Sequence, residues 1–113
     1  MNLNDFRSMV DRLFVKRREG LEGTLHAAIG MAGESGEVLD LVKKTWVTGE
    51  LKPLDADKLL VEAGDAFHYL MMLCITQGWT LEQVAERNRQ KLALRYPGGV
   101  YTDAPNVARR DQS

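Results

Sequence analysis

Apolar residues recur at helical spacing in four segments of the chain, and no segment shows the alternation of a half-buried strand. The segments are residues 4–18, 24–47, 55–76 and 80–96. The third is apolar on more than one face, which predicts a central helix. The pattern predicts an all-α fold, an antiparallel bundle of about four helices, over residues 1–97. Residues 98–113 are rich in Gly, Pro and polar side chains, and we expect a flexible C-terminal tail there.

Residues that favour helix ends lie at the borders of these segments. Asn4 and Asp55 are expected N-caps, and Thr80 begins a sequence typical of a capping box. Gly20 and Gly23 are expected in a loop between the first two helices.

The second predicted helix contains Gly30, Gly33 and Gly36. Each glycine costs about 1 kcal/mol relative to alanine inside a helix. We therefore expect another backbone or a ligand to approach this helix closely.

Composition narrows the class of protein. The chain is 44% apolar and 27% charged with a net charge of −1, so no excess charge favours nucleic acid or an anionic membrane as the main partner. Cys74 is the only cysteine, which excludes an intrachain disulfide. The N-terminus lacks the apolar stretch of a signal peptide, and the longest apolar run, residues 69–75, is too short to span a bilayer. We expect a cytoplasmic protein without a nucleic-acid or membrane partner.

Two acidic pairs stand out, Glu34 with Glu37 and Glu62 with Asp65. Each pair has i, i+3 spacing, which places both carboxylates on one helix face. The connection between the two helices is short, so they should be antiparallel neighbours that carry the pairs at similar height. Four carboxylates favour a hard divalent cation, Mg²⁺ with Mn²⁺ as a substitute. The alternative is a solvated acidic stripe.

Asn88, Lys91 and Arg95 share one face of the fourth predicted helix and could bind the oxygens of a triphosphate. The alternative is an ordinary solvated basic face. Lys44 is in register with Glu37 and could reach a phosphate, although a surface lysine is an equal interpretation.

His26 lies two turns before Glu34, and Tyr69 lies one turn after Asp65. Both could border a nucleotide, with Tyr69 against the sugar or base. A capped or core histidine is an equal interpretation of His26.

Three stretches resemble the MazG-type, all-α nucleoside triphosphate pyrophosphohydrolases. They are residues 26–38 (HAAIGMAGESGEV), 60–70 (LVEAGDAFHYL) and 88–97 (NRQKLALRYP). The resemblance implies Mg²⁺-dependent hydrolysis of (deoxy)nucleoside triphosphates to the monophosphate and pyrophosphate, in housekeeping of the nucleotide pool. It also implies that Glu34, Glu37, Glu62 and Asp65 hold the metal. Of these, Glu37 is the candidate general base. Because the third helix has more apolar surface than this chain can cover, we expect a homodimer or homotetramer.

Other classes of protein remain open at this point. Asp65 and His68 form a carboxylate–histidine pair, as in di-iron carboxylate bundles, although a second such pair is missing. A non-enzymatic helical interaction module is another alternative. Phosphoribosyl-ATP pyrophosphohydrolase is a related enzyme with similar acidic motifs.

Overall fold

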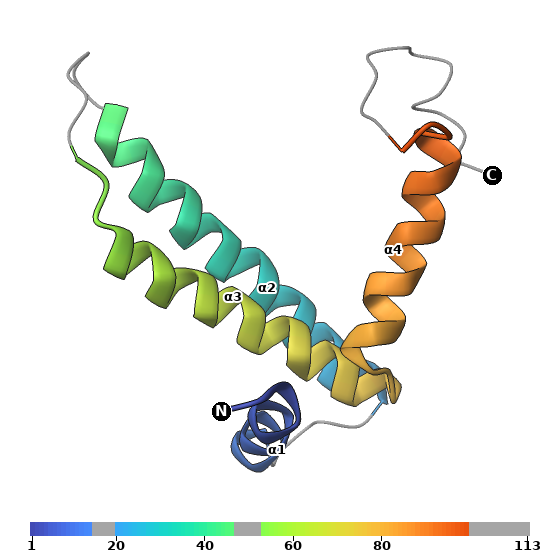
Figure 1. Cartoon of the computed structure of the whole chain (residues 1–113). Coiled ribbons are helices and arrows are strands. Elements are labelled where there is room, and N and C mark those ends of the chain that lie inside the picture. Colours follow the sequence, from blue (N-terminus) through green and yellow to red (C-terminus); the bar gives the residue numbers. More distant parts are fainter. Residues whose placement is uncertain (15–19, 47–52, 100–113) are drawn as a thin grey trace. The chain divides into compact units, whose positions relative to one another are not determined.

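The regular secondary structure of this protein, in the residues that the structure describes, is helical. The computed structural model describes residues 1–14, 20–46 and 53–99. The elements in order are α1 (Leu3–Leu13), α2 (Gly20–Lys43), the short 3-10 helix η1 (Lys44–Trp46), α3 (Ala56–Gln77) and α4 (Leu81–Arg95) (Figure 1). No strand occurs within these residues, which confirms the all-α prediction.

The chain divides into two compact units, Met1–Gly78 and a second unit that starts at Trp79. Each unit is described by itself. The predicted domain over residues 1–97 and tail over 98–113 stay predictions, and residues 100–113 lie outside the described part of the chain.

In the first unit, α2 and α3 lie side by side and run antiparallel (Figure 1). Near the end of α3, the Gln77 side-chain amide donates a hydrogen bond to the Thr24 hydroxyl of α2 at 2.8 Å. Helix α1 packs on α3, where the rings of Phe6 and Phe67 stack with centroids 5.1 Å apart. The predicted antiparallel pairing of the second and third helices is therefore confirmed.

The core of this unit is small and apolar. Among the described residues no buried side chain is polar or charged. The buried hydrophobic residues are Val10, Phe14, Ala27, Met71, Met72 and Cys74. Helix α3 supplies three of them and contacts both other helices, so it is the central helix of its unit, as predicted.

Two predicted helix starts are confirmed by their hydrogen bonds. The Asp55 carboxylate accepts from the backbone N–H groups of Asp57 and Lys58, both at 3.1 Å, and so caps α3. Thr80 and Gln83 form a capping box at the start of α4. Gly78 ends α3 with φ 71°, a left-handed conformation that suits glycine.

The predictions at the N-terminal end need correction. The N-cap of α1 is Asn2 instead of Asn4, because Asn2 shares a capping box with Asp5, whose N–H donates to the Asn2 side chain at 2.8 Å. The predicted loop at Gly20 and Gly23 is wrong. Helix α2 begins at Gly20, and Gly23 is buried inside it.

The remaining predicted boundaries differ in smaller ways. Helix α1 ends at Leu13, earlier than the sequence pattern indicated, and the predicted ends at positions 18 and 47 lie outside the described residues. Helix α4 ends at Arg95, and Tyr96 is its C-cap.

Helix α3 is long and apolar enough to cross a membrane by length and composition. The length of the longest uninterrupted apolar run, residues 69–75, was therefore too strict a criterion for excluding a membrane-spanning helix. A core helix of a soluble protein meets the same criteria, and α3 packs against α1 and α2 within its unit. The absence of a membrane partner stays a prediction.

Candidate metal centre

Three carboxylates from two helices converge on one point of the first unit. Glu34 comes from α2, and Glu62 and Asp65 come from α3. One oxygen of each lies within 4.8 Å of the others. Glu34 and Glu62 are half-buried, and Asp65 is exposed. Helices α2 and α3 pair antiparallel (Figure 1). This pairing brings the acidic motifs of the two helices to the same height, so that their carboxylates converge.

The donor set fits a hard divalent cation. All three donors are carboxylate oxygens, which Mg²⁺ and Mn²⁺ prefer over nitrogen or sulfur. Two oxygens on opposite sides of one Mg²⁺ are about 4.2 Å apart, since each bond is about 2.1 Å long. Only one of the three pairs can lie on opposite sides of the ion, and oxygens on adjacent positions are about 3.0 Å apart. The three oxygens, which lie within 4.8 Å of one another, would therefore move closer together to share one ion. Three carboxylates leave further coordination positions for water or phosphate oxygens.

Glu37, the fourth predicted ligand, does not belong to this group of converging oxygens. Its side chain is exposed on α2, one turn beyond Glu34. It still acts on the centre through its charge, because it contributes to the raised pKa of Glu34. The role of Glu37 as ligand and general base stays a prediction.

The carboxylates of the centre lie close enough together to repel one another. Partial burial raises the pKa of Glu34 above its ordinary value, and the carboxylates of Asp65, Glu62 and Glu37 raise it further. His68 acts in the opposite direction. A cation at this point would relieve the repulsion that raises the pKa of Glu34.

A cluster of rings borders the centre one turn further along the hairpin. Tyr69 lies one turn after Asp65, and its ring contacts that of His68, with centroids 5.2 Å apart. The His26 ring lies 6.2 Å from Tyr69 and 5.5 Å from Phe14. His26 is exposed and Tyr69 is half-buried. Their role at the border of a bound nucleotide stays a prediction.

The position of the Tyr69 ring also explains why α2 has a glycine at position 30. A Cβ atom built on Gly30 would overlap this ring, so the expected close approach to the helix is confirmed there, although a side chain makes it instead of a backbone. No atom lies within 4 Å of a Cβ built on Gly33 or Gly36 in the described structure. At these two positions the described residues therefore do not meet the expectation.

The position of His68 beside the carboxylate centre was not predicted from the sequence. Its i, i+3 spacing from Asp65 suggested an iron ligand, whereas the structure places it against Tyr69 and within electrostatic reach of Glu34. The three converging ligand candidates include no histidine. The i, i+3 spacing of His68 from Asp65 was the available signal for a position beside the centre.

Lys44 forms an ion pair with Asp40, with 2.9 Å between its Nζ and a carboxylate oxygen. The hydrogen bond from Lys44 lowers the pKa of Asp40, and the same hydrogen bond raises the pKa of Lys44. Glu37 adds to the raised pKa of Lys44 through its charge. A role for Lys44 in phosphate binding stays a prediction, and it would compete with the pair to Asp40.

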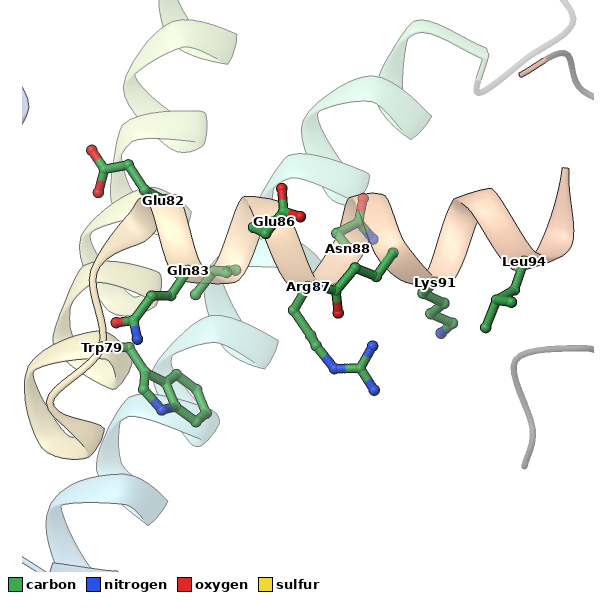
Figure 2. A pocket seen from close by; sticks show the side chains of 10 residues that line it. Trp79, Glu82, Gln83, Glu86, Arg87, Asn88, Lys91 and Leu94 are labelled. Carbon is green, nitrogen blue, oxygen red and sulfur yellow. The ribbon is translucent and has the colours of Figure 1, made fainter. Parts of the chain in front are cut away.

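The second unit carries the predicted phosphate-binding residues on α4. Asn88 and Lys91 are exposed and line a pocket together with Trp79, Gln83, Arg87 and Leu94 (Figure 2). Arg95 is half-buried and is not among the lining residues. Arg89 is engaged by Glu86 at 2.7 Å, so part of the basic helix is an ordinary surface ion pair. Triphosphate binding by Asn88, Lys91 and Arg95 stays a prediction.

Most of the chain is similar to known proteins. Residues 24–100 match the family model of the MazG nucleotide pyrophosphohydrolase domain. The chain is also similar to the Gene 37 protein of Mycobacterium phage L5, with 32% identity over 84 residues, which cover 73% of this chain and 74% of the phage protein. No solved structure matched the chain. The family match covers α3, α4 and all but the first turn of α2, and thus every predicted site residue.

Proposed function

Because the chain belongs to the MazG nucleotide pyrophosphohydrolase family, we propose that it hydrolyses (deoxy)nucleoside triphosphates to the monophosphate and pyrophosphate with Mg²⁺. The observation that carries this proposal is the convergence of Glu34, Glu62 and Asp65 from two helices within the matched region. Carboxylate oxygens alone suit a cation that also binds phosphates.

The proposed roles follow from the position of each carboxylate. Glu34, Glu62 and Asp65 would hold the metal, for which Mn²⁺ can substitute. A bound divalent cation would neutralise charge on the substrate phosphates and on pyrophosphate as it leaves. Glu37 is exposed beside this group and would accept a proton from the water whose oxygen attacks phosphorus, while the bond from that phosphorus to the pyrophosphate oxygen breaks.

The remaining predicted residues would position the substrate. Lys91 and Arg95 supply positive charge and Asn88 supplies an amide for phosphate oxygens, with Lys44 as a further candidate. His26 and Tyr69 would border the nucleoside, since their rings lie one to two turns from the carboxylates along the hairpin. Housekeeping of the nucleotide pool in the cytoplasm, by a homodimer or homotetramer, is the setting that we propose.

The test is release of pyrophosphate from a panel of canonical and modified nucleoside triphosphates, with phosphoribosyl-ATP included. We expect turnover with Mg²⁺ and none in EDTA. Glu62→Gln and Asp65→Asn should each lower turnover at least about 100-fold, because loss of a metal ligand removes several kcal/mol of transition-state stabilisation. Circular dichroism should show unchanged helix content.

Asp57→Asn is the matched control, because Asp57 is an exposed acid on the same helix outside the carboxylate group. It should retain wild-type turnover. A folded wild-type protein that releases no pyrophosphate with any nucleotide would contradict the enzyme proposal and favour an interaction module. Full activity in both carboxylate variants would instead contradict the assigned site.

A further inference from the structure

Four side chains of different chemistry follow one another along the pocket of the second unit. Trp79, Gln83, Arg87 and Lys91 recur at intervals of four residues, and their side chains lie on the same side of α4 (Figure 2). All four are exposed and line the pocket. We call them the α4 row. It begins with an aromatic ring, continues with an amide and ends with two cations.

The capping box at the start of α4 fixes the direction of the amide in this row. The backbone N–H of Thr80 donates a hydrogen bond to Oε1 of Gln83 at 2.7 Å. Because a backbone N–H needs an acceptor, the carbonyl end of the Gln83 amide must face the backbone. The Nε2 end is left to face a ligand, on the same side of the helix as the Trp79 ring (Figure 2). The row therefore offers a ring face with a hydrogen-bond donor one turn away.

The charges along the pocket give it two unlike ends. Arg87 and Lys91 are the cations of the row and lie in the second half of α4. Glu82 lines the pocket in the first turn, whereas the carboxylate of Glu86 is engaged by Arg89. A chain of phosphates would be attracted to the end with the two cations and repelled from the end with Glu82. A ligand that suits both ends has a flat ring at one end and negative charge at the other, as a nucleotide has.

On the basis of the proposed function, in which a nucleoside triphosphate is the substrate, we propose that the α4 row selects the base of that nucleotide. Trp79 stacks on the base, Nε2 of Gln83 donates to a carbonyl oxygen of the base, and Arg87 joins Lys91 at the phosphates. Guanine and thymine carry such a carbonyl oxygen, whereas adenine carries an amino group, a second donor, at the corresponding position. The row therefore favours guanine, thymine and uracil over adenine.

The fluorescence of Trp79 reports on stacking directly. The chain has two tryptophans, and Trp46 is 72% exposed on η1, so Trp46→Phe leaves Trp79 as the single tryptophan of a folded protein. In EDTA, where no turnover is expected, dGTP should quench this fluorescence and bind about 3- to 10-fold more tightly than dATP, measured by competition. Inorganic triphosphate should compete with dGTP without quenching. No quenching by any nucleotide, or equal affinity for dGTP and dATP, would overturn the proposal.

Gln83→Glu separates the hydrogen bond to the base from the capping box. A carboxylate still accepts from Thr80 and keeps the capping box, but it has no donor to offer the base. The added charge weakens both nucleotides alike, so the preference for dGTP over dATP should disappear. Ala85→Glu is the matched control, because Ala85 is exposed on the same helix and does not line the pocket. It should keep the preference, and a Gln83→Glu variant that also keeps it would overturn the role of Gln83.

Trp79→Leu tests the stacking by a second route. Equilibrium dialysis should show binding of dGTP and dATP weakened by about 10-fold or more, because stacking on an aromatic side chain is tolerant of the base. Unchanged affinity would overturn the role of Trp79. No residue of the row belongs to the carboxylate centre. A protein that binds dGTP selectively and releases no pyrophosphate would contradict only the proposed activity, whereas turnover without base preference or quenching would contradict only the role of the α4 row.

Discussion

Substitution by alanine should change the free energy of unfolding differently at two glycines of α2, Gly30 and Gly33. A Cβ on Gly30 would overlap the ring of Tyr69, whereas a Cβ on Gly33 meets no atom within 4 Å in the described structure. Both positions lie inside the same helix, so alanine brings each the same gain of about 1 kcal/mol in helix propensity. Gly33→Ala should therefore stabilise the protein by up to about 1 kcal/mol.

At Gly30 the same gain is opposed by overpacking. The overlap involves ring atoms near the stem of Tyr69, so the ring must leave its position, at a cost of typically 1–3 kcal/mol. Gly30→Ala should be neutral or destabilising by up to about 2 kcal/mol. The propensity gain cancels in the comparison of the two variants, and their free energies of unfolding should differ by about 1–3 kcal/mol.

Urea unfolding measured by circular dichroism gives both free energies, provided that the slope with urea concentration is unchanged. All variants must be compared at one protein concentration, because association would add to the apparent stability. A Tyr69→Leu background provides the control, since without the ring Gly30→Ala should approach the effect of Gly33→Ala. Equal stabilisation by the two alanine variants in the wild-type background would refute the packing of Tyr69 on Gly30.

Two further predictions concern the charged residues. Lys91→Ala and Arg95→Ala should weaken binding of every accepted nucleotide by a similar amount, about 1.5–3 kcal/mol for a charged hydrogen bond, with Arg89→Ala as the control because Arg89 pairs with Glu86. Base-selective effects in the nucleotide panel would place these residues beside the base, and no effect would make them part of a solvated face. In EDTA, the raised pKa of Glu34 makes the folded protein retain a proton that the unfolded chain releases, so stability should fall as pH rises from about 4.5 through that raised pKa. Thermal unfolding across this pH range should show a smaller fall for Glu34→Gln, and an equal fall would contradict the pKa direction.

The helices of this protein were predictable because their signals are local. Apolar periodicity located all four, and the caps at Asp55 and Thr80 depend on hydrogen bonds between residues two or three positions apart. The start of α1 was misplaced because Asn2 and Asn4 are both good caps by type. Only the capping box between Asn2 and Asp5 decides between them.

For the carboxylate site, the sequence predicted at which height its residues lie along the two neighbouring helices α2 and α3. The i, i+3 pairs and the short connection were enough to bring Glu34 level with Glu62 and Asp65. The sequence also matched one family closely enough to indicate the class of reaction. Periodicity predicted α4 only as a helix, and α4 belongs to a separate unit of the chain.

The rotation of α2 about its own axis, relative to α3, was decided only by the tertiary structure. Glu37 follows Glu34 by about 300° around α2, so the angle at which α2 packs on α3 determines whether one or both carboxylates reach the centre. That angle depends on long-range packing, including the contact between Tyr69 and Gly30. The sequence by itself determined that four segments of the chain are helical and which carboxylates lie at similar height on α2 and α3. Packing between helices determined which face of α2 meets α3, because no local pattern records the orientation of one helix against another.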